Sequence, residues 1–154
     1  MIFNDNLIFR NDKHFENFRI VMGSEFPNIY RKLCDGEKLE TIEVGYYFIL
    51  SSFLDSKFLL RHKLFAINYI QKDFLSQSEY NLLNFATQLL DRKQLDLSVL
   101  NLISDDDQVL LKTGFDIAYD ELSITTDVLF ELISTLHQNE VQITTFKEDY
   151  HLER

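Results

Sequence analysis

The clearest helical pattern in the chain lies in residues 38–54, which read KLETIEVGYYFILSSFL. Apolar side chains recur there at intervals of three and four residues, so they share one face of a helix. The stretch therefore predicts a helix, and its Tyr46-Tyr47-Phe48 cluster is expected in the core. The buried stripe is expected to consist of Leu39, Ile42, Tyr46, Ile49 and Phe53.

The composition around this stretch also favours helices. The 154 residues include 14 Phe and 7 Tyr but only 4 Gly and 1 Pro. Folds built from many strands need Gly and Pro at their turns, so this scarcity indicates long helices joined by short polar loops. We predict an all-α or α-dominated fold: a single domain over residues 1–154, arranged as an irregular helical bundle. Short strands are allowed at the two termini, in the first nine residues and in the alternating stretch 141–146.

Local signals place the first helices. Asn11 or Asp12 is suited to cap a helix that Gly23 would end, and Pro27 is suited to the first turn of a further helix. Ser56 is a candidate cap for a later helix. The apolar stripe of that helix is expected at Leu60, Leu64 and Ile67, with Ile70 as a further candidate.

Two serines mark the later helices. Ser76 is followed three residues on by Glu79, which is the pattern of a capping box. Ser104 and Asp107 have the same spacing and predict the start of another helix. Gly114 would interrupt that helix or divide it in two.

The chain also carries two similar segments. Residues 61–70 and 109–118, RHKLFAINYI and VLLKTGFDIA, resemble the second helices of HEAT-type repeats. Their separation is close to the period of such repeats, about 40–47 residues. The resemblance implies stacked helix pairs, and a compact irregular bundle is the alternative.

The composition argues against several environments. Cys34 is the only cysteine, so an internal disulfide is excluded and a reducing cytoplasm is favoured. The first residues lack the pattern of a signal peptide, and no run of 18 apolar residues predicts a membrane span. A net charge of −10 disfavours direct binding to nucleic acid or to anionic membranes, since both need positive charge on the protein.

No catalytic, metal or cofactor motif is present. The glycines are scattered and form no phosphate-binding loop. Asp105–Asp107 lacks the alternate spacing and the glycine of a calcium loop. His137 and Glu140 are three residues apart, but no second His-Glu pair supports a metal site within a bundle. Cys34 has no predicted partner that would activate it. We therefore expect no enzymatic activity, metal or cofactor.

The distribution of charge is the main functional clue. Residues 1–93 contain 12 acidic and 12 basic residues and form a neutral body. Residues 94–154 contain 13 acidic residues and only three basic ones, a net charge of −10. A concentrated acidic field steers a basic partner toward the surface and fixes its orientation.

Spacing gathers some of these acids on helix faces. Asp116 and Asp120 are four residues apart, as are Asp127 and Glu131, so each pair shares a face. Lys112 is the only nearby base. The alternative is that the acids at helix starts only complement the helix dipole. The candidate partner-binding residues are Asp105, Asp106, Asp107, Asp116, Tyr119, Asp120, Glu121, Asp127 and Glu131.

These features predict a small acidic inhibitor that binds another protein. In size, acidity and lack of catalytic motifs the chain is similar to bacterial toxin-immunity proteins, which implies a basic toxin domain, such as a nuclease, as the partner. Tight binding also needs aromatic anchors, and Tyr119 is the candidate. The alternative is a non-catalytic helical scaffold or adaptor for an endogenous basic partner. The oligomeric state is not indicated.

Overall fold

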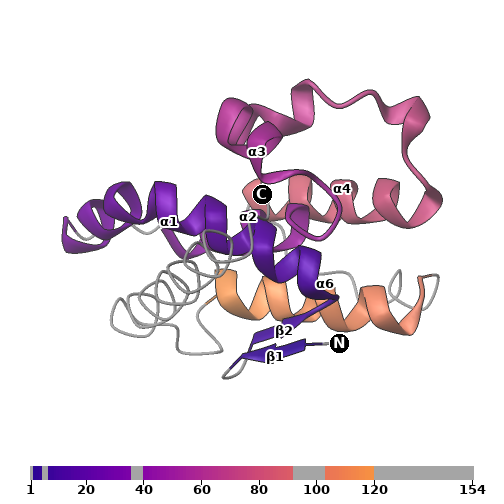
Figure 1. Cartoon of the computed structure of the whole chain (residues 1–154), viewed down its shortest axis with the longest axis horizontal. Coiled ribbons are helices and arrows are strands. Elements are labelled where there is room, and N and C mark those ends of the chain that lie inside the picture. The colour runs from indigo at the N-terminus through magenta and orange to yellow at the C-terminus, as the bar shows by residue number, and fades with distance from the viewer. Residues whose placement is uncertain (1, 5–6, 36–39, 92–102, 120–154) are drawn as a thin grey trace, which may run out of the picture. The chain divides into compact units, whose positions relative to one another are not determined.

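Helices dominate the structure, a computed structural model that describes residues 2–4, 7–35, 40–91 and 103–119. All of these residues belong to one compact unit, residues 1–123. The predicted α-dominated fold is confirmed. In chain order the elements are β1 (Ile2–Asn4), β2 (Leu7–Phe9), α1 (Asp12–Cys34), α2 (Glu40–Leu50), α3 (Ser56–His62), the 3₁₀ helices η1 (Lys63–Asn68) and η2 (Lys72–Phe74), α4 (Gln77–Leu90) and α6 (Asp105–Ala118) (Figure 1).

The strands form a short antiparallel hairpin at the N-terminus. Phe3 pairs with Ile8 at its centre, so the predicted N-terminal strand is confirmed. The strand predicted at 141–146 lies outside the described residues. Among the helices that the structure describes, none has the length and apolarity that crossing a membrane requires.

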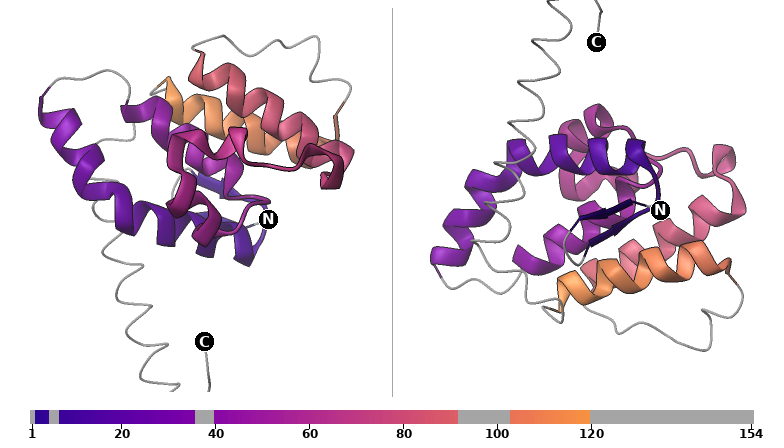
Figure 2. Two further views of the ribbon diagram at one scale, coloured as in Figure 1. Left: turned by 90° about the horizontal axis from the view of Figure 1, so that it is seen from above. Right: turned by 60° about the horizontal axis from the view of Figure 1, so that its bottom comes forward.

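The predicted central helix is α2, and it is buried around its whole circumference. Every residue from Ile42 to Leu50 is buried, because α2 packs against α6, α4 and α1. Figure 2 shows α4 and α6 lying side by side. The predicted stripe residues Ile42, Tyr46 and Ile49 are buried as expected, whereas Phe53 lies beyond the end of α2 and is half-buried. The predicted stripe covers only one face of the helix, whereas the structure buries all faces. A helix with apolar residues on every side lies inside the core.

Helix α1 is longer than predicted. Asn11 caps it, since its side-chain oxygen accepts a hydrogen bond of 2.8 Å from the His14 N–H. The helix then continues through Gly23 and Pro27 to Cys34, so the predicted break between two helices is wrong. A proline inside a helix removes one hydrogen bond and bends the axis, and α1 bends along its course in both views of Figure 2. Tertiary packing of this helix outweighs its local breakers.

Helix α6 is also continuous. Ser104 caps it as predicted, accepting the Asp107 N–H at 3.2 Å, but Gly114 does not interrupt it. Gly114 lies where α6 meets α2, and a Cβ atom added there would lie 2.5 Å from Ile49 Cγ1. On α2, a Cβ added at Gly45 would lie 2.5 Å from the Gly114 carbonyl oxygen. The two glycines therefore allow the backbones to approach closely.

The segment after α2 departs most from prediction. Asp55, not Ser56, caps α3, accepting the Lys57 N–H at 3.0 Å. The α-helix ends at His62 and a 3₁₀ helix follows, so residues 61–70 do not form one helix and the resemblance to a HEAT repeat fails there. The buried apolar residues are Leu59 and Ala66, whereas the predicted stripe of Leu60, Leu64, Ile67 and Ile70 is only half-buried. Helix α4, in contrast, begins with the predicted capping box of Ser76 and Glu79.

Candidate partner-binding surface

The predicted acidic site begins at the first turn of α6. Three consecutive acids, Asp105, Asp106 and Asp107, follow the Ser104 cap, where negative charge complements the helix dipole. Asp105 and Asp106 are exposed. Asp107 is only 3% exposed and points into the protein. The three acids therefore have different environments, although the sequence makes them look alike.

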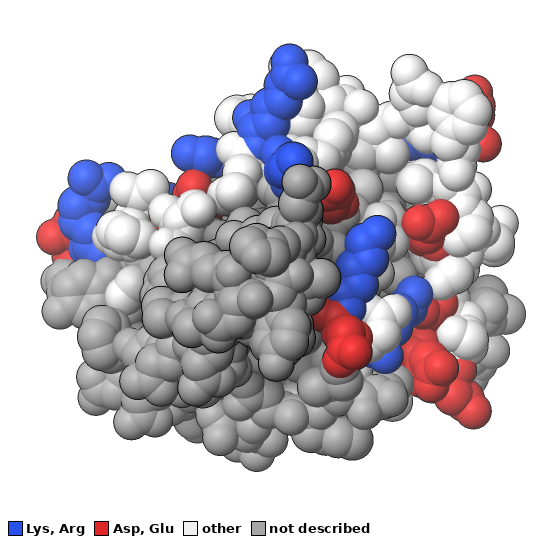
Figure 3. Space-filling model, viewed as in Figure 1, with Lys and Arg blue, Asp and Glu red and all other residues white. Residues whose placement is uncertain are grey.

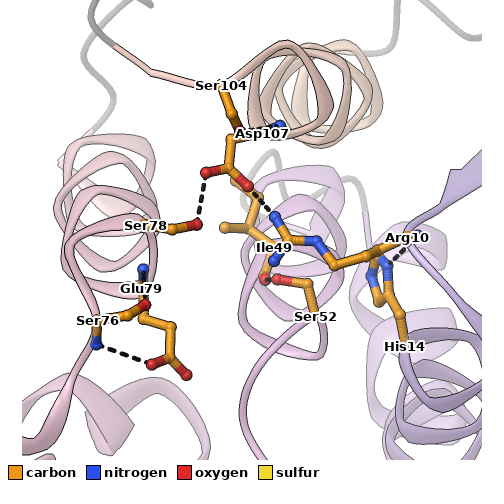
Figure 4. Close-up of polar contacts among 9 residues, drawn as sticks. All are labelled: Arg10, His14, Ile49, Ser52, Ser76, Ser78, Glu79, Ser104 and Asp107. Carbon is orange, nitrogen blue, oxygen red and sulfur yellow. Dashed lines mark hydrogen bonds and ion pairs between the residues drawn. The ribbon is translucent and has the colours of Figure 1, made fainter.

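Asp107 is committed to contacts within the chain. One carboxylate oxygen forms an ion pair with the Arg10 guanidinium, and the other accepts a hydrogen bond from the Ser78 hydroxyl of α4 (Figure 4). This triad ties α6 to the end of β2 and to α4. Since both of its carboxylate oxygens are engaged, we remove Asp107 from the candidate partner-binding residues.

Arg10 gives the acidic turn a base that the sequence did not place there. It is 97 residues away from Asp107 along the chain, and only the fold brings them together. Burial lowers the pKa of Arg10, while the negative charges of Asp106 and Glu79 oppose that shift. Within the described part of the chain, its Nε atom is buried without a hydrogen-bond partner. Lys112 is therefore not the only basic residue near these acids.

The outward face of α6 holds three more of the predicted residues, Asp105, Asp116 and Tyr119, together with Lys112. Asp105, Lys112 and Tyr119 are exposed and Asp116 is half-buried. They recur at helical spacing, on the side opposite the buried Gly114, which faces α2. Asp105 and Asp116 therefore share one face of α6. Outside the described residues lie Asp120, Glu121, Asp127 and Glu131.

Tyr119 forms the C-terminal cap of α6. Its side chain is 40% exposed, and its ring lies 6.2 Å from that of Phe115. The end of the helix is held by the Thr41 hydroxyl, which donates to the Ala118 carbonyl at 2.7 Å. An aromatic side chain on a fixed helix end loses little freedom when it packs against a partner.

Charge on the visible surface is mixed. Toward the lower right of Figure 3, the side on which Figure 1 places the start of α6, acidic and basic side chains lie next to one another. On this face, the described residues do not form a purely acidic surface. The field around Asp105 and Asp106 is therefore weaker than the charge of residues 94–154 alone suggests.

His14 is a structural residue and not a catalytic or metal-binding one. Its side chain is fully buried; Nδ1 accepts the Arg10 backbone N–H at 3.0 Å, and Nε2 donates to the Phe48 carbonyl at 2.7 Å. Burial lowers its pKa to about 4, although the hydrogen bond to Phe48 opposes the shift. No group of three potential metal ligands occurs among residues 2–4, 7–35, 40–91 and 103–119. The side chain of Cys34 lies outside the described part.

The sequence did not reveal a cavity beside α2. It is lined by residues of α1, α2, the end of α3 and η1, among them Tyr47, which we had expected to be simple core packing. The only signal was the polar residue Glu43 within an apolar helix. Four basic residues, Arg31, Lys32, Arg61 and Lys63, also line it, but they are spread over two distant segments.

Comparison with protein-family models, with curated proteins and with solved structures found no match to this chain. The function is therefore argued from the residues and their geometry.

Proposed function

We propose that this chain is a non-enzymatic inhibitor that binds a basic protein through the outward face of α6 and the acidic residues that follow it. In its most specific form it is a cytoplasmic immunity protein or antitoxin, and its partner is a basic toxin domain, such as a nuclease. Binding would occlude the cationic active site of the toxin. A nuclease needs such a site to hold its substrate, so an acidic inhibitor complements it.

The exposed pair Asp105 and Asp106 is the observation that carries this proposal. A helix N-terminus contributes a positive charge of about +0.5, and the two carboxylates exceed it. Helix-start chemistry therefore leaves this end of α6 negative. The rest of residues 94–154 adds to the same sign, because only three of the 16 charged residues there are basic.

The length of α6 suits a protein partner. Asp105 and Tyr119 lie at opposite ends of its outward face, about 20 Å apart at the helical rise. An interface of standard size, about 800 Å² on each partner, extends over such a distance. Acids at one end would guide the approach of the partner, and Tyr119 would supply an apolar contact at the other.

The adaptor alternative uses the same surface but a different partner. It is favoured by the modest charge of the described outward face, where Lys112 offsets part of the acidic charge. An endogenous partner needs only transient binding, whereas inhibition of a toxin needs a very low dissociation constant.

Affinity capture from the native cell at low salt, followed by mass spectrometry, tests the proposal. We expect a stoichiometric complex with one basic protein that weakens as salt rises, because exposed charges are screened. Asp105→Asn/Asp106→Asn should slow association. The matched control is Asp35→Asn/Asp73→Asn, which removes two exposed acids elsewhere and changes the net charge equally.

The two functions differ in the partner that is captured. A partner that kills the cell when expressed alone identifies an inhibitor, and a harmless partner identifies an adaptor. Equal association rates for the two double variants would remove the α6 surface from consideration. The absence of any basic protein at stoichiometric amount would refute both functions.

A further inference from the structure

A cavity of about 610 Å³ opens between the C-terminal half of α1, helix α2 at Glu43 and Tyr47, and the junction of α3 with η1. Its size lies within the range of small-molecule sites, about 300–1,000 Å³. It is formed by the described residues of all three elements and lies apart from the outward face of α6. Its possible role is therefore independent of the function proposed above.

The lining of the cavity is positive in a chain that is strongly negative overall. Four basic residues and two acidic ones, Glu25 and Glu43, line it, an excess of two positive charges. Lys32 Nζ lies 2.7 Å from Glu43 Oε1, and Lys63 Nζ lies 3.2 Å from Glu25 Oε1. Both carboxylates are therefore neutralised by ion pairs within the lining.

The two arginines of the cavity remain without such pairs. Arg31 from α1 and Arg61 from α3 are exposed, and neither forms an ion pair with any residue of the described ranges. A guanidinium group presents several N–H donors in one plane, which matches the oxygens of a carboxylate or a phosphate. The two arginines without an ion pair therefore offer the guanidinium groups that an anionic ligand needs.

Tyr47 supplies a polar group to the lining of the site. Its side chain is only 2% exposed, yet its hydroxyl forms no hydrogen bond with any residue that the structure describes. Burial raises its pKa, and the negative charges of Glu25 and Glu43 raise it further, so the hydroxyl remains protonated and able to donate. The neighbouring Tyr46 differs, because its hydroxyl donates to the Lys63 carbonyl at 3.0 Å. Arg10 Nε is the one buried side-chain nitrogen or oxygen without a partner in the described part of the chain, so the Tyr47 hydroxyl is accessible from the cavity and can be reached by a ligand.

The backbone at the edge of the cavity is strained. Lys63 has a φ of 51° and is the one non-glycine residue with positive φ in the described part of the chain. Its N–H donates to the Leu59 carbonyl, and its own carbonyl accepts the Tyr46 hydroxyl. Such conformations persist where the surroundings impose them, and they are common at ligand sites. Here the strained turn sets the Lys63 side chain against Glu25.

We infer that this cavity binds a compact organic anion, whose carboxylate or phosphate group is held by Arg31 and Arg61 and whose deeper polar atom accepts a hydrogen bond from Tyr47. Phe65, 67% exposed and also part of the lining, offers an apolar contact for the organic part. The excess of two positive charges in the lining favours an anion over a neutral or cationic ligand.

Three small aromatic probes test the charge requirement on the full-length chain. Phenyl phosphate and phenylacetate represent the two anionic groups, and phenylacetamide is the neutral control. Chemical shifts of backbone amides would be followed during each titration. We expect saturable shifts at Arg31, Tyr47 and residues 61–65 with at least one anion and none with the amide. Binding of only one anion would identify the acidic group that the site prefers.

Two variants and a matched control test the assigned residues. Arg31→Gln/Arg61→Gln should weaken the binding of the active probe about tenfold or more, because hydrogen bonds to charged groups are the strong ones. Tyr47→Phe should weaken it about fivefold, the value of one neutral hydrogen bond. Lys57→Gln/Lys72→Gln removes the same charge from exposed residues outside the lining and should leave binding unchanged.

Failure of the inference has clear signatures. It is overturned if neither anion gives saturable shifts at the cavity residues throughout the millimolar range, or if the neutral amide binds equally well. It is also overturned if the arginine variant, folded as judged by circular dichroism, binds as tightly as the lysine control. Since Tyr47→Phe removes a hydroxyl without a partner in the described chain, its effect on binding is separable from an effect on folding.

Discussion

The two faces of α2 are equally buried but differently packed. Gly45 and Tyr47 are two residues apart and therefore point about 200° away from each other on the helix. On the Gly45 side, the backbone of α6 is so close that a Cβ atom has no room. On the Tyr47 side lie two carboxylates, two unpaired arginines and a cavity of about 610 Å³.

This difference teaches that burial and packing are separate properties. The α6 side has the dense contacts of a protein core, which hold the fold together. The cavity side buries polar groups, which is costly unless they have partners. Glu43 has a partner in Lys32, while Tyr47 has none among the described residues. The packed face is thus a scaffold, and the open face has free groups that a ligand could use.

Replacing Gly45 by alanine should cause the largest loss of stability. The new methyl group would meet the Gly114 carbonyl oxygen at 2.5 Å and the Ala118 Cβ at 2.9 Å. Backbone atoms cannot move without shifting a helix, so we expect a loss of about 2–3 kcal/mol in the free energy of unfolding. The higher helix propensity of alanine, about 1 kcal/mol, offsets only part of the strain. Urea denaturation measures the effect.

Gly114→Ala is the matched control, because Gly114 lies on α6 at the same contact between α2 and α6. Its methyl group would meet the Ile49 side chain, with Cγ1 at 2.5 Å and Cδ1 at 2.8 Å, and a side chain can change its rotamer. We expect a smaller loss than for Gly45→Ala. If Gly45→Ala unfolds at the same urea concentration as the unaltered chain, the helices do not approach as closely as described.

A pH titration of stability tests a third side of α2, where His14 donates to the Phe48 carbonyl. Burial lowers the His14 pKa to about 4, whereas the unfolded chain binds the proton near pH 6.5. The contribution of His14 is therefore complete above pH 6.5 and is lost as the pH falls toward 4. We expect a loss of about 2 kcal/mol between pH 7 and pH 5.

The control for this titration is His14→Gln, which keeps a donor and an acceptor but does not titrate. It should be less stable at pH 7, because the ring of His14 packs against Phe9 and Phe48. Between pH 7 and pH 5 its free energy of unfolding should fall by less than that of the unaltered chain, because the contribution from protonation of His14 is absent. An identical pH dependence in both proteins would mean that the imidazole is not held neutral.

Much of the fold could be predicted because local chemistry determines it. The caps at Ser76 and Ser104 were read correctly, since the side chain and the N–H it accepts are only three residues apart. The central helix was evident from its apolar pattern. The errors at Gly23, Pro27 and Gly114 have one cause. Local chemistry makes the two glycines helix breakers and Pro27 the start of a new helix, but packing against distant elements decides whether a helix continues.

The candidate sites could be predicted only in part, because the sequence does not show which charged residues the fold brings together. Asp105 and Asp107 look equivalent, yet one is exposed and the other is paired with Arg10. The cavity depends on Arg31 and Arg61 reaching one space from α1 and α3. No local pattern links these residues. The expectation that Tyr47 belongs to the core was correct for its burial and missed its free hydroxyl.

The smallest effects should separate the two adjacent tyrosines of α2. Tyr46→Phe removes the hydrogen bond to the Lys63 carbonyl, so we expect a loss of about 1 kcal/mol in the free energy of unfolding. Tyr47→Phe removes a hydroxyl that bonds to no described residue and should change stability by less than about 0.5 kcal/mol. Denaturation of both variants in parallel measures the difference. If Tyr47→Phe is as destabilising as Tyr46→Phe, the Tyr47 hydroxyl already has a partner within the protein. The open face of α2 would then be as fully satisfied as the packed one, and the free donor assigned to the anion site would be lost.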